Sequence, residues 1–322
     1  MRGLMTDDDG LTFEYLDADE AAFLYEEIFT RRSYLRHGVH IDKAGSPVIL
    51  DAGANIGLFG LLCLRENPAA RIFAVEPSPA AFGCLERNLG ANSAGAACAQ
   101  VLLREAPSAM GHSLHCYPDA PGESTCNPVE RRQQRSRLRD HVRRSAAAGT
   151  SPAAAGAEAA AAAAASTVTV VPATTVSHLL ASWGLCAVDL LKIDVEGDEL
   201  SVLRGIASSD WPRIRQVTCE VHDVHGRLAR VLGLLRRHGM RATCELQRGG
   251  EVDGYVMVVP ASLRLYYVYA CRPNVGGESV GEVRHEGGPE ALSPKAAEPE
   301  AASRSAAAGG GVARKANRKR KR

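Results

Sequence analysis

The chain has 322 residues, of which 45% are hydrophobic and 23% charged, and its formal net charge is +1. This composition is typical of a globular protein long enough to bury a core, and it excludes strong attraction of the whole molecule to nucleic acid or an anionic membrane. No run of about 18 apolar residues occurs, so we expect no membrane span. The acidic N-terminus, with Asp7, Asp8 and Asp9, predicts no signal or transit peptide.

The nine cysteines are dispersed and form no C-x-x-C pair. This spacing predicts neither a disulfide framework nor a structural zinc site. Free cysteines fit a reducing compartment, so we expect a cytoplasmic protein.

Strand and helix patterns alternate along the first part of the chain. An N-terminal extension, residues 1–46, contains one predicted helix at about 19–32. The elements expected after it are a strand at 48–50, a helix at 56–65, a strand at 71–75, a helix at 80–90 and a strand at 97–103. Alternation of this kind predicts right-handed βαβ units, and therefore an α/β fold with a mostly parallel central sheet and helices on both faces.

A low-complexity segment interrupts this pattern at residues 130–166. Seven arginines fall within 130–144, and fourteen alanines with Gly and Pro fall within 146–165. The segment has no apolar face to pack, so we expect a solvated insertion, whether ordered or not. A site for nucleic acid or another anionic partner is the alternative interpretation of the arginines.

The alternation resumes after the insertion. The expected elements are a helix at 174–183, a strand at 188–194, a helix at 199–205, a strand at 214–221, a helix at 227–238 and strands at 241–247 and 263–271. The loops at 104–130 and 248–262 carry no readable pattern.

These elements define a predicted domain over residues 47–272, followed by a tail over 273–322. The tail is too rich in Gly, Ala, Glu and Pro to bury enough surface to order itself. Its basic end, 314–322, is interpreted as a solvated tail. The alternative is a nuclear-localisation or RNA-binding segment.

A glycine-rich turn, Asp51-Ala-Gly53-Ala-Asn55-Ile-Gly57, lies between the first strand of the domain and its helix. Gly53 and Gly57 permit a tight turn and close approach of a ligand to the backbone, and the helix start offers free N–H groups. The turn lacks the G-x-G-x-x-G spacing that admits a pyrophosphate, which disfavours an NAD-dependent oxidoreductase. Asp51 would repel a phosphate and suit a cationic or zwitterionic ligand such as S-adenosylmethionine (SAM).

A second acidic residue, Glu76, ends the next strand, 25 residues after Asp51. A carboxylate at that place accepts hydrogen bonds from the ribose hydroxyls of a nucleoside in dinucleotide-binding folds. The turn and Glu76 together predict a nucleoside-bearing cofactor. A strand–turn–helix unit that binds no nucleotide is the alternative.

Charged residues also end the strand at 188–194. Lys192, Asp194 and Glu196 alternate along it, so we expect them to face one side. Such groups are costly to bury unless they are paired or face a cleft. They therefore predict either site residues or a structural ion-pair network.

The next strand ends with Glu220 and His222, which again share a face. Histidine is the natural base near neutral pH. A structural or positioning role for His222 remains an alternative. Cys219, His222 and His225 match no strong zinc signature, so we expect no metal site.

At these residues the sequence resembles the FkbM-type methyltransferase family. The resembling segments span about 48–272 without the insertion, and they read VILDAGANIGLFGLL, FAVEPSPAAFGCLERNL, YPDAPGEST, TTVSHLL, VDLLKIDVEGDELSVLRGI and EVHDVHGRL. Upstream, 24–29 and 34–38 resemble the flank of some polyketide-associated members. The segment 103–111 departs from the family pattern, so no residue is assigned to the adenine.

The resemblance implies a Rossmann-like class I methyltransferase fold, SAM as cofactor and, in most members, O-methylation of a hydroxyl on a polyketide, sugar or other small secondary metabolite. Glu76 would hold the ribose, and Asp194 and Glu196 would face the reacting centre. The methionyl side would be lined by Asp51, Gly53, Asn55 and Gly57.

We hypothesise that a substrate hydroxyl attacks the SAM methyl group in line, with alignment of the two ligands and a base assisting. The candidates for the base are His222 first, then Asp194 or Glu196. The alternative is a catalytically silent SAM-binding module whose basic segments mediate interactions.

Overall fold

A computed structural model of the chain describes residues 2–93, 96–117, 121–136, 166–247, 250–252, 255–257 and 264–273. The chain divides into two units, Met1–Glu278 and Ser279–Arg322, and all described residues belong to the first. Residues 137–165 of the predicted insertion and the basic end at 314–322 lie outside the described residues. Within the described ranges, no helix has the length and apolar character needed to cross a membrane.

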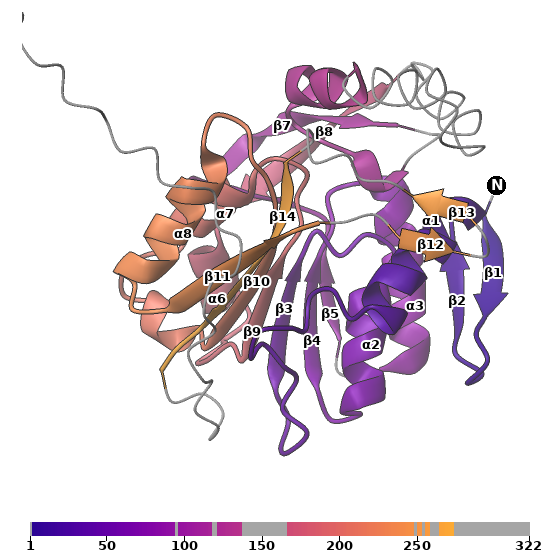
Figure 1. Ribbon diagram of the computed structural model, residues 1–322, viewed down its shortest axis with the longest axis horizontal. Coiled ribbons are helices and arrows are strands. Elements are labelled where there is room, and N and C mark those ends of the chain that lie inside the picture. The colour runs from indigo at the N-terminus through magenta and orange to yellow at the C-terminus, as the bar shows by residue number, and fades with distance from the viewer. Residues whose placement is uncertain are drawn as a thin grey trace, which may run out of the picture. The chain divides into compact units, whose positions relative to one another are not determined.

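The first unit is built around a seven-stranded sheet with the order β11-β14-β10-β9-β3-β4-β5 (Figure 1). Its five neighbouring strands from β10 to β5 are parallel, and β14 is antiparallel to both of its neighbours. This confirms the predicted α/β fold. The strands are β3 (Val48–Ala52), β4 (Arg71–Val75), β5 (Ala97–Ala99), β9 (Leu190–Ile193), β10 (Gln216–His222), β11 (Arg241–Leu246) and β14 (Leu265–Cys271).

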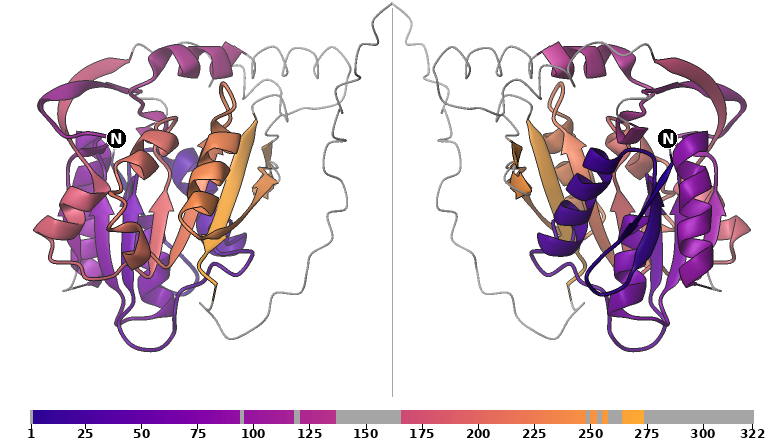
Figure 2. Two further views of the ribbon diagram at one scale, coloured as in Figure 1. Left: turned by 90° about the vertical axis from the view of Figure 1, so that its left-hand side faces the viewer. Right: turned by 90° about the vertical axis from the view of Figure 1, so that its right-hand side faces the viewer.

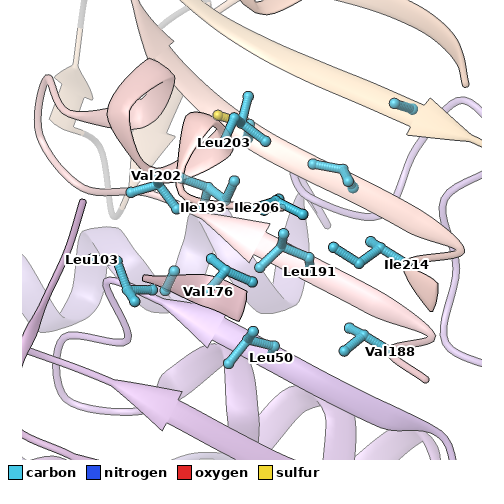
Figure 3. Packing of buried hydrophobic residues seen from close by; sticks show 14 of the residues in the cluster. Leu50, Leu103, Val176, Val188, Leu191, Ile193, Val202, Leu203, Ile206 and Ile214 are labelled. Atoms are coloured by element: carbon cyan, nitrogen blue, oxygen red, sulfur yellow. The ribbon is translucent and has the colours of Figure 1, made fainter. Parts of the chain in front are cut away.

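Helices cover both faces of this sheet because its central strands are apolar on both sides. Ile49 of β3 packs with α2 (Leu58–Glu66) and α3 (Pro79–Asn92). Its neighbour Leu50 points the other way and belongs to the cluster drawn in Figure 3. That second cluster contains residues of α6 (Val176–Ser182), α7 (Glu199–Arg204), the turn η3 (Trp211–Arg213) and α8 (Arg227–Arg237).

The two side views in Figure 2 show this layering. In the left view α8 (orange) lies in front of the sheet. In the right view α1 (indigo) and α3 (purple) lie on the near side.

The N-terminal extension contains more structure than the single predicted helix. Strands β1 (Gly3–Thr6) and β2 (Thr12–Tyr15) form an antiparallel hairpin. Helix α1 (Ala18–Tyr25) follows, with Asp17 as its N-cap, and continues as a π-helical turn, η1 (Glu26–Thr30). Phe13, Ile28 and Tyr34 are buried in the same cluster as α2, so this extension completes the core on that face of the sheet.

A second, three-stranded sheet was not predicted. The expected strand at 97–103 is split between β5 of the main sheet and β6 (Leu102–Leu103). Strand β6 pairs with β8 (Thr167–Thr174), which pairs with β7 (Ser108–Cys116). The region interpreted as a loop at 104–130 therefore holds a strand and the turn η2 (Pro121–Glu123), and the helix expected from 174 begins at Val176.

The region interpreted as a loop at 248–262 likewise contains a short hairpin. Its strands are β12 (Gly250–Val252) and β13 (Tyr255–Met257).

Residues 128–136, at the start of the predicted solvated insertion, form a helix. Gln134 is 8% exposed, and the side chain of Arg131 is 12% exposed. Solvation is therefore contradicted for Arg131 and Gln134, whereas Arg132, Gln133 and Ser136 are exposed as expected. The cause is the polar partners that Arg131 and Gln134 find in segments distant along the chain.

Candidate active site

The site lies where the direction of the chain across the sheet reverses. From β3 the chain proceeds through β4 to β5 at one edge, then returns to β9 and β10 on the other side of β3. Open α/β sheets bind ligands beyond the carboxyl ends of the strands at such a switch point. The four segments singled out in the sequence follow or end β3, β4, β9 and β10, so the topology places them at one edge of the sheet.

The glycine-rich turn is shaped by two close contacts. Gly53 has φ of +79°, and a Cβ on it would lie 1.7 Å from the carbonyl oxygen of Asp194. Gly57 has φ of +92°, and a Cβ on it would lie 2.8 Å from Leu85 Cδ1. Only glycine fits both positions, because each combines a left-handed φ with close packing.

Glu76 closes this turn from the end of β4. Its Oε2 accepts a hydrogen bond from the backbone N–H of Asn55 at 2.9 Å, and its Oε1 accepts one from Ser78 N–H at 2.8 Å. Burial raises the pKa of Glu76 to about 7, although both N–H groups act to lower it. Each carboxylate oxygen retains a lone pair for another donor.

The side chain of Asn55 meets a residue that the sequence analysis did not select. Asn55 Nδ2 donates to Glu20 Oε1 at 3.1 Å, and Gly122 N–H donates to the same oxygen at 2.7 Å. Glu20 Oε2 and Asn55 Oδ1 are buried without a hydrogen-bond partner. Burial raises the pKa of Glu20 to about 7. Two neighbouring acceptors without donors point to a ligand that brings donors.

Asp51 lies beneath the turn, fully buried. The Nζ of Lys192 is 3.2 Å from Asp51 Oδ1, donates to Gly53 O at 2.9 Å and is 3.6 Å from Asp194 Oδ2. Burial acts to lower the pKa of Lys192, but Asp51 and Asp194 outweigh it and raise that pKa. Lys192 therefore belongs to an ion-pair network, the alternative interpretation of this segment. The charge of Asp51 is balanced, so it no longer favours a cationic ligand by itself.

Asp194 is held by a tyrosine from the N-terminal extension. Tyr34 OH donates to Asp194 Oδ2 at 2.9 Å, across 160 residues of sequence. The Tyr34 ring packs edge-on against Phe59, and Lys192 Nζ lies 5.1 Å from its centroid. Two groups thus already engage the Asp194 carboxylate.

His222 and Glu196 face each other beyond β9 and β10. The Nε2 of His222 is 3.4 Å from Glu196 Oε2 and 3.5 Å from Glu220 Oε1. Neither His222 Nε2 nor Glu196 Oε2 makes a hydrogen bond, although both atoms are buried. On the other side of the ring, His222 Nδ1 is 2.7 Å from Gln134 Nε2. The predicted pairing of Glu220 and His222 on one face is thereby confirmed.

Glu196 does not share the strand face with Lys192 that was expected, because it lies beyond the end of the strand. Strand β9 ends at Ile193, and Glu196 adopts φ of +52° in the loop that follows. Its carboxylate lies 3.4 Å from Arg131 Nη1, and its carbonyl accepts from Thr125 Oγ1 at 2.7 Å. Burial raises the pKa of Glu196, although Arg131 and His222 act to lower it.

A further acidic layer lies beside Glu220. Tyr267 OH donates to Glu27 Oε1, and Gln247 Nε2 donates to Tyr267 OH at 2.8 Å. Burial, with the nearby charge of Glu220, raises the pKa of Glu27 to about 8. Burial also raises the pKa of Glu220 well above its ordinary value. Both carboxyl groups are therefore protonated well above the pH at which free glutamate ionises.

Cys219, His222 and His225 do not come together in the structure. Cys219 is buried in the apolar cluster on one face of β10, whereas His222 points to the other face and His225 is exposed. Within the part of the chain that the structure describes, no group of three His, Cys, Asp or Glu side chains is arranged to hold a metal.

Sequence reasoning missed Glu20, Glu27 and Tyr34 as site residues, together with Arg131 and Gln134. The segments 24–29 and 34–38 had been noted as resembling a family flank, which was the available signal for Glu27 and Tyr34. Nothing in the sequence indicated that Gln134 is buried, because the residues around it are mostly arginines.

Comparison with known proteins gives consistent matches. The model of the family described as "Methyltransferase FkbM domain" matches residues 51–242. The 31-O-demethyl-FK506 methyltransferase FkbM of Streptomyces tacrolimicus is 37% identical over 236 residues, which cover 73% of this chain and 88% of that protein. Methyltransferase sdnD of Sordaria araneosa is 32% identical over 235 residues, with the same shares of both chains.

Among solved structures, the N-terminal domain of human METTL16 in complex with SAH is similar, with a TM-score of 0.40 and 12% identity. The match covers 84% of this chain and 88% of that one.

Proposed function

Because the chain belongs to the FkbM methyltransferase family, we propose that it transfers a methyl group from SAM to a hydroxyl group of a small molecule. The observation that carries this proposal is the arrangement at the switch point. The glycine-rich turn and Glu76 lie at the ends of β3 and β4. At the ends of the neighbouring strands β9 and β10, Glu196 Oε2 and His222 Nε2 face each other, and neither has a hydrogen-bond partner.

The residues around the turn fit SAM. The free acceptors Glu20 Oε2 and Asn55 Oδ1 suit the ammonium group of its methionyl part, and Glu76 retains lone pairs for the ribose hydroxyls. Gly53 and Gly57 add no side chains of their own to the turn. Asp51 would act indirectly, by fixing Lys192 and through it the carbonyl of Gly53. SAM, when bound, supplies a methyl group on a positively charged sulfur.

The chain's own residues would hold the substrate hydroxyl and take its proton. Of the three candidates, Asp194 is already engaged by Tyr34 and Lys192, so we assign it a positioning role. Glu196 Oε2 and His222 Nε2 each lack a hydrogen-bond partner, so we assign these two residues as the catalytic pair. Proton transfer by such a positioned group contributes about 10²–10⁴-fold to the rate.

The substrate class follows from a relative. The Streptomyces tacrolimicus protein is named as a methyltransferase of 31-O-demethyl-FK506, a small molecule that lacks a methyl group on an oxygen. We extend O-methylation of a polyketide-, sugar- or secondary-metabolite-like hydroxyl to this chain and assign it to residues 47–272. A catalytically silent SAM-binding module would have no use for the buried, unsatisfied atoms Glu196 Oε2 and His222 Nε2. Their presence therefore disfavours that alternative.

Calorimetric titration with SAM, and separately with NADH, tests the cofactor. We expect SAM to bind in the micromolar range and NADH not to bind. Glu76→Ala removes two backbone partners and a ribose acceptor, so it should weaken SAM binding by at least tenfold. Glu86→Ala, on the exposed side of α3, is the matched control and should leave the affinity unchanged. A folded wild-type protein that binds no SAM refutes the proposal.

A further inference from the structure

The orientation of one buried amide determines the protonation pattern of His222. Arg131 carries only hydrogen-bond donors, and its Nη1 donates to Gln134 Oε1 at 3.0 Å. The amide oxygen of Gln134 must therefore face Arg131. Its Nε2, which is only a donor, then faces His222 Nδ1 at 2.7 Å.

It follows that Nδ1 of His222 is the acceptor in this contact and carries no proton. A neutral imidazole has one protonated nitrogen, so the proton is on Nε2. Formation of an imidazolium would set Nδ1–H against the amide N–H of Gln134. Rotation of the amide would instead set its N–H groups against the guanidinium of Arg131.

Two of the three carboxyl groups around the His222 ring face an arginine. Glu196, in the loop after β9, faces Arg131 at 3.4 Å. Glu199 of α7 faces Arg227 of α8 at 3.5 Å, and Arg227 also donates to His222 O at 2.6 Å. The remaining carboxyl group, Glu220 of β10, lies 3.5 Å from Nε2. Burial raises the pKa of Glu220, as it raises that of Glu196.

This arrangement leaves a donor and an acceptor side by side. The Nε2–H of His222 and the Oε2 of Glu196 are 3.4 Å apart, buried and without hydrogen-bond partners. A hydroxyl group is both an acceptor and a donor, so it complements the pair: its oxygen receives the Nε2–H and its proton points to Glu196.

We propose that Arg131 and Gln134, on the helix over 128–136, lock His222 as the Nε2–H tautomer, so that His222 positions the substrate hydroxyl and Glu196 takes its proton. The hydroxyl O–H bond breaks and its proton passes to Glu196. The oxygen forms a bond to the methyl carbon while the carbon–sulfur bond breaks, its electron pair remaining on sulfur. The hydroxyl part of this inference rests on the proposed function, whereas the tautomer does not.

The tautomer is measured directly, without SAM or substrate. The full-length protein is labelled with ¹⁵N-histidine, and long-range ¹H–¹⁵N correlation distinguishes a protonated from an unprotonated ring nitrogen. The chain has ten histidines, so the His222 signals are assigned by their loss in His222→Asn. We expect a protonated Nε2 and an unprotonated Nδ1 at neutral pH. A protonated Nδ1 in the wild-type protein overturns the inference.

Gln134→Glu provides the sharpest variant, since it keeps the shape of the side chain but replaces the donor to Nδ1 with an acceptor. We expect Nδ1 to become protonated in this variant. Gln133→Glu makes the same change on the exposed neighbouring residue and should leave the His222 signals unchanged. If Gln134→Glu folds, as judged by circular dichroism and thermal unfolding, and still shows an unprotonated Nδ1, the lock does not exist.

Methyl transfer to a hydroxylated substrate tests the second half. Glu196→Gln should lower kcat about 10²–10⁴-fold with the SAM Kd unchanged. Gln134→Glu should lower kcat and shift its pH profile, whereas Gln133→Glu should do neither. Full turnover by Glu196→Gln overturns its role as proton acceptor. Absence of SAM binding in the wild-type protein instead overturns the proposed function and leaves the tautomer measurement intact.

Discussion

Replacement of Gly53 by alanine is the most direct test of how the cofactor turn is built. The added Cβ would lie 1.7 Å from the carbonyl oxygen of Asp194 and 2.7 Å from its carbonyl carbon. These are backbone atoms, and the N–H of Asp194 is tied to Ala52 O at 2.9 Å, so they cannot yield as a flexible side chain would. The turn and the end of β9 must therefore separate.

Two costs add in this variant. Alanine at φ of +79° costs about 1–2 kcal/mol. Forcing an extra methyl group into a packed site costs about 1–3 kcal/mol more. We therefore expect the free energy of unfolding of Gly53→Ala to fall by about 2–5 kcal/mol. SAM affinity should also fall, since the turn would no longer hold the geometry that brings Asn55 N–H to Glu76.

Urea unfolding at equilibrium, followed by SAM calorimetry on the folded fraction, measures both effects. Gly184→Ala is the matched control, because Gly184 has φ of +63° and a Cβ added there would meet no atom within 4 Å. It should show only the backbone cost of about 1–2 kcal/mol. Equal destabilisation by the two substitutions, or an unchanged SAM Kd in Gly53→Ala, would show that the contact with Asp194 does not shape the turn.

Three further predictions concern the buried polar groups. Lys192→Met should lower the free energy of unfolding, measured in urea, by about 3–5 kcal/mol, because it leaves Asp51 charged and unpaired. Adding Asp51→Asn in the same chain should restore part of this loss. If Lys192→Met caused no loss, the pairing with Asp51 would be refuted. Tyr34→Phe should cost about 1.5–3 kcal/mol by the same measurement, because the hydrogen bond to the Asp194 carboxylate is lost while the ring remains; stability equal to wild type would contradict this. Glu27 has a pKa of about 8 in the folded protein, against an ordinary 4.5. Between these two values the folded state holds a proton that the unfolded chain has released. The contribution of Glu27 to the free energy of unfolding therefore falls as pH rises from 4.5 to 8, by at most about 1.4 kcal/mol per pH unit. Glu27→Gln should remove that slope from unfolding free energies measured between pH 5.5 and 7.5, and an unchanged slope would show that Glu27 is ionised throughout.

The sequence by itself determined the parts of the site that depend on local pattern. The apolar strands, the glycine-rich turn and Glu76 occur within short stretches, and parallel strands carry their carboxyl ends to one edge of the sheet. The meeting of Glu196 and His222 followed from that rule, since each comes soon after or at the end of a parallel strand.

Other features depend on contacts between distant segments, and only the tertiary structure decided them. Tyr34 reaches Asp194 across 160 residues, and Gln134 reaches His222 across 88. The arginine-rich segment appeared polar throughout, yet the helix over 128–136 buries the amide of Gln134.

Asp51 illustrates the same limit. Its sequence position indicated a residue at the ligand, but the structure buries it completely against Lys192. Periodicity records which residues share the face of one element. The partner of a buried polar side chain is fixed instead by the packing of elements far apart in the chain, and a buried charge is stable only where that packing supplies a partner.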